Sequence, residues 1–364
     1  MVDKCVAVLV ISGMKSLRFK PVWADSLGAK SFCTLVETPD VRVLIDPGVA
    51  IMHGSYPAPP GLKLEWLEEG RRAVVEASRN VDVVVITHYH YDHYTDFDSR
   101  LYRGRLVIAK SPNEYINDSQ RGRAMRFYAN LFAMGRLGLA EVLEEPLERE
   151  YPDPFNELEL ARSRDYGDYA ERKRELLEKG RAWFERRAEK WRGYERIPEY
   201  DCPDFRLRFA DSKTFEFGST RLRFSKPLFH GVEYSRVGWV VWVVVEYGGR
   251  KLLYSSDVNG PIIEDYAEWI IREKPDILLL DGPATYTLGY MLNLINLGRA
   301  VENVKRIISE AQPELILFDH HLPREPRYRE RVAEVYREAE REGVKVMTVA
   351  EYMGLKPKVL EEYS

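Results

Sequence analysis

Four side chains that can bind a metal ion fall within six consecutive residues, His88-Tyr89-His90-Tyr91-Asp92-His93. The segment follows a β-branched apolar run, Val81 to Thr87, which predicts a buried strand. His88 and His90 are two residues apart, so in an extended chain both side chains project to one side and can face one ion. Asp92 and His93 lie past the expected turn and can face a second ion. The hexapeptide therefore predicts a metal site where a strand ends.

Further imidazoles and carboxylates follow other strand-like apolar runs: Asp46, His230, Asp257 and the pair His320-His321. These groups suit zinc and related ions. An isolated His230 or Asp257 is more often a structural polar group. Once the hexapeptide is assigned to metal, however, three more protein ligands are needed to fill two coordination spheres, which favours these positions. His53, beside Gly54 in a Pro-rich loop, has no predicted role.

The hexapeptide is the signature of the metallo-β-lactamase superfamily, which the chain resembles over most of its length. The resemblance implies a centre with two ions. His88, His90 and His230 would hold the first ion, and Asp257 would bridge the two. The second ion would be held by Asp92, His93 and either His320 or His321. Asp46 would orient a ligand histidine without binding a metal ion itself. We favour His320 over His321 because it shares strand parity with Ile316 and Phe318, and because the matching histidine of phosphodiesterase-type relatives comes first.

Several segments also resemble a little-characterised archaeal branch of this superfamily: residues 25–31, 46–48, 281–283 and 320–324. The first of these is either an ordinary turn or a loop whose Lys30 binds an anionic group near the metals. Arg324, four residues after His320, resembles an arginine that handles phosphate in the tRNA 3′-processing branch. The serine and tyrosine of that branch's motif are lacking, and a role as a salt-bridge partner is the alternative for Arg324. Tyr89, Tyr91 and Tyr94 are packing residues, or one of them orients substrate or donates a proton.

These residues indicate a dinuclear metal-dependent hydrolase with two zinc ions, or with iron or manganese in their place. A hydroxide that bridges the metals would attack a phosphodiester or another ester-type bond, and Asp92 could manage the proton. The expected partner is a small-molecule or phosphate-bearing substrate. One alternative is a catalytically silent, metal-containing binding or structural protein. A diiron redox role is disfavoured, because the relatives with that role carry a glutamate where His90 stands.

Composition limits the class of protein. The net charge of −4 gives no electrostatic footprint for nucleic acid, so a nucleic-acid partner is not indicated. Three unpaired cysteines, no signal-peptide pattern behind the apolar run Cys5 to Ile11, and no membrane-length apolar stretch favour a cytoplasmic protein. The chain has only two glutamines, whereas 31% of its residues are charged. This composition is typical of proteins from thermophiles. No Gly-rich nucleotide loop and no serine-nucleophile elbow follows a strand.

Two strand-rich parts of the chain must position these residues. Strands are expected at 6–11, 32–37, 41–45, 81–87 and 106–109, with a helix at 64–78. From residue 215 strands return at 222–225, 237–246 and 251–255. Strands at 277–281, 315–318 and 344–349 then alternate with helices at 263–272, 299–311 and 327–342. This pattern predicts an α/β protein with a four-layer αβ/βα sandwich, in which residues 1–112 and 201–364 form one metallo-β-lactamase-like domain.

Residues 113–200 interrupt the pattern and predict a helical insertion. Helices are expected at 121–144 and 158–194, and residues 157–195 contain 10 acidic and 11 basic side chains. An apolar stripe is predicted along Tyr169, Leu176, Trp183 and Trp191. The insertion is either a solvated arm packed by this stripe, or a cap over the site or an arm that forms a homo-oligomer. Because it holds none of the ligand candidates, we expect it to govern substrate access and not metal assembly.

Overall fold

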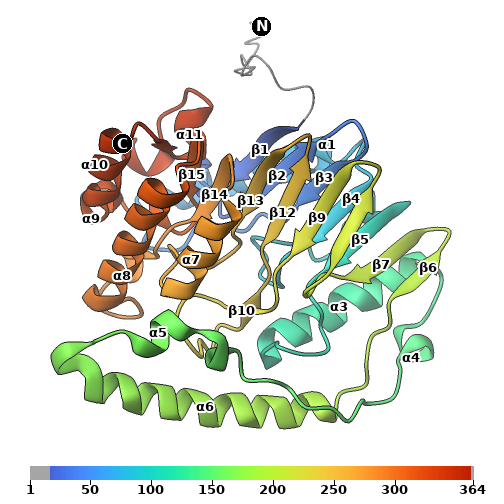
Figure 1. Cartoon of the computed structure of the whole chain (residues 1–364). Coiled ribbons are helices and arrows are strands. Elements are labelled where there is room, and N and C mark those ends of the chain that lie inside the picture. Colours follow the sequence, from blue (N-terminus) through green and yellow to red (C-terminus); the bar gives the residue numbers. More distant parts are fainter. Residues whose placement is uncertain (1–16, 362–364) are drawn as a thin grey trace, which may run out of the picture.

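The computed structural model describes residues 17–361 and contains two seven-stranded sheets packed face to face (Figure 1). Helices cover the outer face of each sheet, which confirms the predicted four-layer αβ/βα sandwich. The strand expected at Val6 to Ile11 lies outside the described residues. None of the helices within residues 17–361 combines the length and apolar character that a membrane span requires.

The first sheet has the strand order β1-β2-β3-β4-β5-β7-β6. Its strands are β1 (Arg18–Ala24), β2 (Phe32–Glu37), β3 (Arg42–Ile45), β4 (Val83–Ile86), β5 (Arg105–Ala109), β7 (Phe205–Phe209) and β6 (Tyr200–Cys202). β3, β4, β5 and β7 run parallel to one another, so the carboxyl ends of β3 and β4 lie side by side. Asp46 follows β3 and the hexapeptide follows β4, which places both at the same edge of the sheet.

The second sheet has the order β16-β15-β14-β13-β12-β9-β8. Its strands are β8 (Thr214–Phe217), β9 (Thr220–Phe224), β12 (Val243–Tyr247), β13 (Arg250–Tyr254), β14 (Ile277–Asp281), β15 (Leu315–Asp319) and β16 (Lys345–Met347). β13 to β16 run parallel. Their carboxyl ends therefore bring Asp257, Asp281 and the His320-His321 pair to one edge. His230 follows β10 (Leu228–Phe229), which pairs only with β11 (Trp239–Val240).

Alternation along the strands explains the layers. In β4, Val83 and Val85 face the second sheet, whereas Val84 and Ile86 face outward against the helices. The outer helices are α1 (Pro60–Ala77), α2 (Ser99–Tyr102) and α3 (Asp118–Met134) on the first sheet. On the second sheet they are α7 (Glu264–Glu273), α8 (Leu294–Arg306), α9 (Tyr328–Arg331) and α10 (Ala333–Glu342), whereas α11 (Val349–Tyr352) packs against β1 and β15 at the core between the sheets. The central strands β4, β14 and β15 are thus buried on both faces, as their continuous apolar sequences require.

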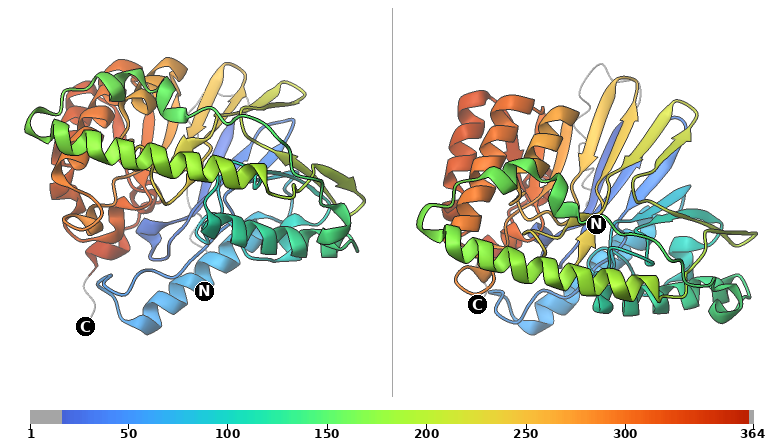
Figure 2. Two further views of the ribbon diagram at one scale, coloured as in Figure 1. Left: turned by 90° about the horizontal axis from the view of Figure 1, so that it is seen from below. Right: turned by 60° about the horizontal axis from the view of Figure 1, so that its bottom comes forward.

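The insertion contains a long helix that crosses the edge of the sandwich. It comprises α3, α4 (Leu139–Val142), the 3-10 turns η2 (Pro154–Glu157) and η3 (Gly167–Tyr169), α5 (Glu159–Ser163) and α6 (Ala170–Arg192). α6 runs from beside α7 and α8 to beside α3, across the side of the molecule where β10 lies (Figures 1 and 2). It therefore spans both halves of the sandwich on the side that carries His230.

Several boundaries differ from the sequence prediction. The run 237–246 is divided between β11 and β12, because Val241 N bonds Thr87 O and Trp242 N bonds Ser225 Oγ between the two strands. The first sheet also includes β6 and β7, which follow α6 in the sequence and were not among the expected strands. The helix expected at 158–194 is broken between α5 and η3, and the helix expected at 327–342 is broken at Val332, which has φ −119°.

The predicted stripe on α6 is also wrong in part, because Leu176 is 41% exposed. The buried side chains of α6 are Lys173, Phe184, Arg187, Ala188 and Trp191. Lys173 and Arg187 are charged but can be buried because Glu233 and Asp118 pair with them. A pattern of apolar residues alone could not identify the buried face of α6, because Lys173 and Arg187 belong to it.

Candidate metal centre

The structure brings the ligand candidates together in three overlapping groups. His88, His90, His230 and Asp257 present ligand atoms that all lie within 4.8 Å of one another. By the same measure, Asp92, His93 and His320 form a second group, and Asp257, His320 and His321 form a third. The side chains of His88, His93, His320 and Asp257 are buried, whereas His90 and Asp92 are partly exposed. We call the side of the site where His90 and Asp92 reach solvent its mouth.

Asp257 lies between the first two groups and presents one oxygen to each. Its Oδ2 lies 3.4 Å from His88 Nε2 and 3.0 Å from His230 Nε2. Its Oδ1 lies 3.0 Å from His93 Nε2 and 3.3 Å from His320 Nε2. A carboxylate in this position can bind one ion with each oxygen, as a bridging ligand does.

The donor set fits metal ions because its polar atoms are otherwise unsatisfied. Both oxygens of Asp257 and the Nε2 of His230 are buried and have no hydrogen-bond partner. Leaving such groups unpaired in a protein interior costs free energy, and ionised groups cost the most. Nitrogen atoms also face nitrogen atoms, with His88 Nε2 at 3.0 Å from His90 Nδ1 and His93 Nε2 at 3.1 Å from His320 Nε2. Cations between these atoms would satisfy all of them.

Asp46 holds His93 in a fixed orientation. Its Oδ2 accepts hydrogen bonds from His93 Nδ1 at 2.7 Å and from the Tyr254 hydroxyl at 2.8 Å. Its Oδ1 accepts from the backbone N–H of Thr87 at 2.8 Å. The bond to Nδ1 leaves Nε2 of His93 directed at Asp257, which is the arrangement that metal-binding histidines need. Asp46 therefore lies where the resemblance places it.

Gly48 allows the loop after β3 to approach the hexapeptide. A Cβ at this position would lie 2.3 Å from Tyr94 N and 2.4 Å from His93 N. Any larger residue would push Asp46 and His93 apart. Gly48 in the Asp46-Pro47-Gly48 sequence thus allows the close approach by which Asp46 orients His93.

Two further aspartates orient histidines in the same way, and sequence reasoning did not assign either one. Asp25 Oδ1 accepts from His320 Nδ1 at 3.1 Å and from Ser31 N at 2.9 Å. Asp281 Oδ1 accepts from His321 Nδ1 at 2.8 Å. Both aspartates lie in segments that stood out in the sequence, at 25–31 and 281–283. Their histidine partners could not be read from those segments.

Burial and the neighbouring charges shift the pKa values of the groups in the site. Burial opposes ionisation of Asp257, but His93, His320 and His88 hold the pKa of its carboxyl well below the usual range. Burial likewise opposes protonation of His93, but Asp257 and Asp46 raise its pKa to about 10. Burial and the neighbouring His93 lower the pKa of His88 to about 4, so this imidazole is neutral at pH 7, the form that binds metal.

Comparison with known proteins agrees with this geometry. Residues 28–159 match the model of the metallo-β-lactamase superfamily. A UPF0282 protein of Methanopyrus kandleri is 35% identical over 361 residues, which cover 95% of this chain and 97% of that protein. A UPF0282 protein of Korarchaeum cryptofilum is 30% identical over 348 residues, covering 95% and 92% of the two chains.

The chain belongs to the UPF0282 family of the metallo-β-lactamase superfamily. Among solved structures, it is similar to the metallo-β-lactamase fold protein YhfI of Bacillus subtilis, with a TM-score of 0.39 and 12% identity over 87% of this chain and 88% of that one. It is also similar to the short form of human tRNase Z, with a TM-score of 0.36 and 11% identity over 84% and 92% of the two chains.

Within this UPF0282 chain, Arg324 is an ion-pair partner, the second of its two predicted roles. Its Nε donates to Asp25, its Nη2 donates to Asp92 Oδ2 at 3.2 Å, and its Nη1 donates to the Tyr286 hydroxyl at 3.2 Å. The side chain is buried. Arg324 therefore holds Asp25 and Asp92 together, and its predicted contact with a phosphate stays a prediction.

The other candidate side chains, three tyrosines and Lys30, differ in their exposure to solvent. Tyr89 and Tyr94 are fully buried, and the Tyr89 hydroxyl bonds Lys110 O and the Tyr128 hydroxyl. Only Tyr91 of the three reaches solvent, where Arg126 donates to its hydroxyl at 2.7 Å.

Lys30 is half-buried. Burial and Arg324 lower the pKa of its ammonium, while Asp92 and Asp25 oppose that change, so Lys30 lies within electrostatic reach of the mouth.

The argument from strand parity that favoured His320 fails. Ile316 and Phe318 face the outer helices, and β15 ends at Asp319. His320 and His321 have positive φ angles of 47° and 30°, so neither continues the strand. The positions of the two imidazoles depend on this turn. It directs His320 toward His93, and the ring of His320 stacks on Phe32 with centroids 5.6 Å apart.

The insertion contacts the loop that carries His230. Lys173 of α6 pairs with Glu233 at 2.6 Å, and the rings of Trp183 and Trp239 stack with centroids 5.2 Å apart. Gly180 lets α6 approach Tyr234, because a Cβ there would lie 2.5 Å from that side chain. The expectation that the insertion leaves metal assembly alone stays a prediction, and the contacts of α6 with the segment that presents His230 are the place to test it.

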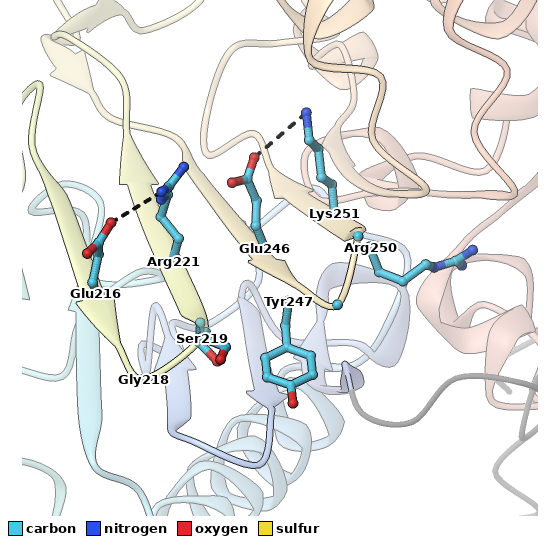
Figure 3. Close-up of a pocket in the computed structure, with 11 residues that line it drawn as sticks. Glu216, Gly218, Ser219, Arg221, Glu246, Tyr247, Arg250 and Lys251 are labelled. Atoms are coloured by element: carbon cyan, nitrogen blue, oxygen red, sulfur yellow. Dashed lines mark hydrogen bonds and ion pairs between the residues drawn. The ribbon is translucent and has the colours of Figure 1, made fainter.

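A hollow of about 420 Å³ lies elsewhere, beside the β8–β9 and β12–β13 hairpins (Figure 3). Its charged side chains pair with each other, with Arg221 at 3.3 Å from Glu216 and Lys251 at 3.7 Å from Glu246. It lies at the opposite end of β13 from Asp257. We assign it no part in the metal centre.

Proposed function

We propose that the protein is a dinuclear metal-dependent hydrolase that cleaves an ester-type bond, with phosphodiesters among the candidate substrates. The observation that carries this proposal is the side chain of Asp257. Its two oxygens are buried without hydrogen-bond partners, and each faces a different pair of imidazoles. Zinc is the first choice of metal because the donors are imidazole and carboxylate, and iron or manganese would use the same donors.

The chain's own residues would prepare the site for this reaction. Two ions bound here would lower the pKa of a shared water toward ~7. Asp46 and Asp25 fix the imidazoles of His93 and His320, so that the ligand geometry is set before substrate arrives. We propose that Asp92, which lies at the mouth and pairs with Arg324, manages a proton. Lys30 adds a positive charge nearby, which favours a substrate that bears phosphate or another anionic group.

Metal analysis and a substrate screen test the proposal together. Protein purified without chelator should contain about two equivalents of zinc, iron or manganese, and Asp257→Asn should lose at least one. Asp201→Asn, which alters a surface carboxylate paired with Arg208, is the matched control and should keep both. Turnover of a phosphodiester, a lactone or a thioester should disappear with chelation and return with metal.

Two results would count against the proposed function. A wild-type protein that binds no metal would remove its basis. A protein that holds two metals but hydrolyses none of these bonds would support the alternative, a catalytically silent metal-containing protein.

A further inference from the structure

Two segments beside the mouth carry no charged residues, although 31% of the chain is charged. Residues 47–59 follow Asp46, and residues 282–298 follow Asp281. Neither contains Asp, Glu, Lys or Arg. His53 is the titratable imidazole of the first segment, and burial together with the Arg324 charge lowers its pKa to about 4. Both segments are therefore uncharged at neutral pH.

Large apolar side chains of these segments project into solvent. Tyr290 is 90% exposed, Leu294 is 73% exposed and Met291 is 66% exposed, and Ile295 and Ile51 are also exposed. We call these five side chains the apolar patch. Exposing this much apolar surface in a short segment is unfavourable unless something covers it.

The backbone that displays the apolar patch is fixed by hydrogen bonds. Gly289 N bonds Leu292 O at 2.8 Å, and the N–H groups of Tyr290 and Met291 both bond Thr287 O at 3.0 Å. In the other segment, the buried Lys63 ammonium donates to His53 O and Gly54 O, each at 3.0 Å. The patch is thus held in a defined shape, and Leu294 and Ile295 lie at the start of α8.

A short series of contacts connects the apolar patch to the metal ligands. The rings of His53 and Tyr286 stack with centroids 4.7 Å apart, which joins the two segments (Figure 2 shows both segments at the same end of the molecule). Tyr286 accepts a hydrogen bond from Arg324, which also donates to the ligand candidate Asp92. Tyr290 is only four residues from Tyr286, so their Cα atoms are at most ~14 Å apart. Tyr286 thus connects the segment that bears most of the patch to the mouth.

The size and charge of the patch indicate its occupant. A stable protein interface uses ~20–30 residues from each partner, far more than five side chains. An uncharged surface next to a polar site suits the apolar part of a small ligand, because such ligands bury apolar area while a few polar groups fix their orientation. We infer that the substrate has an alkyl or aryl arm that packs on the apolar patch while its anionic or ester group lies at the metals. This inference rests on the proposed hydrolase function and narrows its substrate class.

Binding of two phosphonates that share a head group tests the inference. Methylphosphonate and octylphosphonate, the latter below its micelle concentration, would be titrated into zinc-loaded full-length protein by calorimetry. Octylphosphonate should bind at least tenfold more tightly, which corresponds to burial of about two methylene groups. In the triple variant Tyr290→Ser, Met291→Ser, Leu294→Ser, the two affinities should agree within about twofold, with methylphosphonate unchanged. The control variant Leu147→Ser, Leu355→Ser removes exposed apolar side chains outside the patch and should keep the preference.

The possible outcomes separate this inference from the proposed function. Equal affinities in the wild type, or a preference that survives in the triple variant, would overturn the inference and leave the metal centre intact. A fall in molecular mass of the triple variant by light scattering would also overturn it, because the patch would then join copies of the chain. If neither phosphonate bound the two-metal protein, the inference would fail, whereas the hydrolase proposal would still be judged by turnover and metal content.

Discussion

His320 and His321 are adjacent in sequence but face different parts of the centre. His320 Nε2 lies 3.1 Å from His93 Nε2 and 3.3 Å from Asp257 Oδ1, so it belongs with the group of Asp92 and His93. His321 Nε2 lies 3.9 Å from the other oxygen, Oδ2, and its Nδ1 is held by Asp281. The geometry therefore supports His320 as the ligand, although for a different reason from strand parity.

Replacing each histidine in turn tests this assignment. His320→Ala should reduce the metal content from two equivalents to about one, because the second ion loses a ligand. His321→Ala should retain two equivalents by elemental analysis. The reverse pattern would assign the ligand to His321.

Asp25 is expected to affect metal affinity through His320 without touching the ion. Asp25→Asn weakens the acceptor for His320 Nδ1 and removes the charge opposite Arg324, so affinity for the second ion should fall by ~10–100-fold. Competition with a chromophoric chelator measures this change. Asp276→Asn is the matched control, because that carboxylate also pairs with an arginine and accepts from a backbone N–H but precedes β14, at the opposite end of that strand from Asp281. Equal metal affinity in Asp25→Asn and wild type would contradict the assigned role.

Among the elements, α6 is connected to the loop that carries His230 through a buried cluster of charges. Arg299 of α8 bonds Glu233 at 2.5 Å and Glu264 of α7 at 2.7 Å, and Lys173 of α6 completes the cluster. Glu233 is three residues from His230. Lys173→Met should therefore loosen the loop that presents His230 and weaken binding of the first ion by ~10-fold, near the low end for supporting residues.

A second ion pair of α6 supplies the control for that experiment. Arg187 pairs with Asp118 at 2.5 Å. It lies near the C-terminal end of α6, whereas Lys173 lies near the N-terminal end. Arg187→Met should destabilise the helix but leave both metals in place. If both variants lost metal equally, the effect would reflect general loosening of the insertion and not the contact with Glu233.

The same cluster predicts a dependence of stability on pH. Burial raises the pKa of Glu233, but Arg299 and Lys173 outweigh it and lower the value from 4.5 to about 2. Because the folded pKa is depressed, the stabilisation is present above pH 4.5 and is lost as pH falls toward 2. The full effect is about 3 kcal/mol. Denaturant unfolding of chelator-treated protein at pH 6 and pH 3 should show a smaller loss in Glu233→Gln than in wild type. Equal losses would refute this account.

At the scale of the whole molecule, the metal centre joins the two sheets. The hexapeptide follows β4 of the first sheet, whereas Asp257 and His320 follow β13 and β15 of the second. Ions bound between them should stabilise the packing of the sandwich, because they bind the folded chain and not the unfolded one. Chelation should therefore lower the Tm by roughly 5 °C in calorimetry. Asp257→Ala should have a lower Tm that chelator changes little. A chelator effect as large in that variant as in wild type would show that the ions act elsewhere.

The amino-acid sequence by itself determined the strand ends and the residues that occupy them. The hexapeptide keeps four ligand candidates within six residues, so its geometry is largely local. Asp46 and Asp257 could be predicted because each follows an apolar run, and parallel strands end at a common edge. The four-layer fold followed from the same alternation of strands and helices.

Only the tertiary structure decided which side chains support those ligands. Asp25 and His320 are 295 residues apart, and Asp281 and His321 are 40 apart, so neither pair has a local signature. The stacking of His53 on Tyr286, the pairing of Lys173 with Glu233 and the turn at His320 likewise arise from packing between distant segments. The physical reason is that backbone periodicity specifies where a strand ends, whereas the partner of a side chain depends on how two sheets and a crossing helix approach each other.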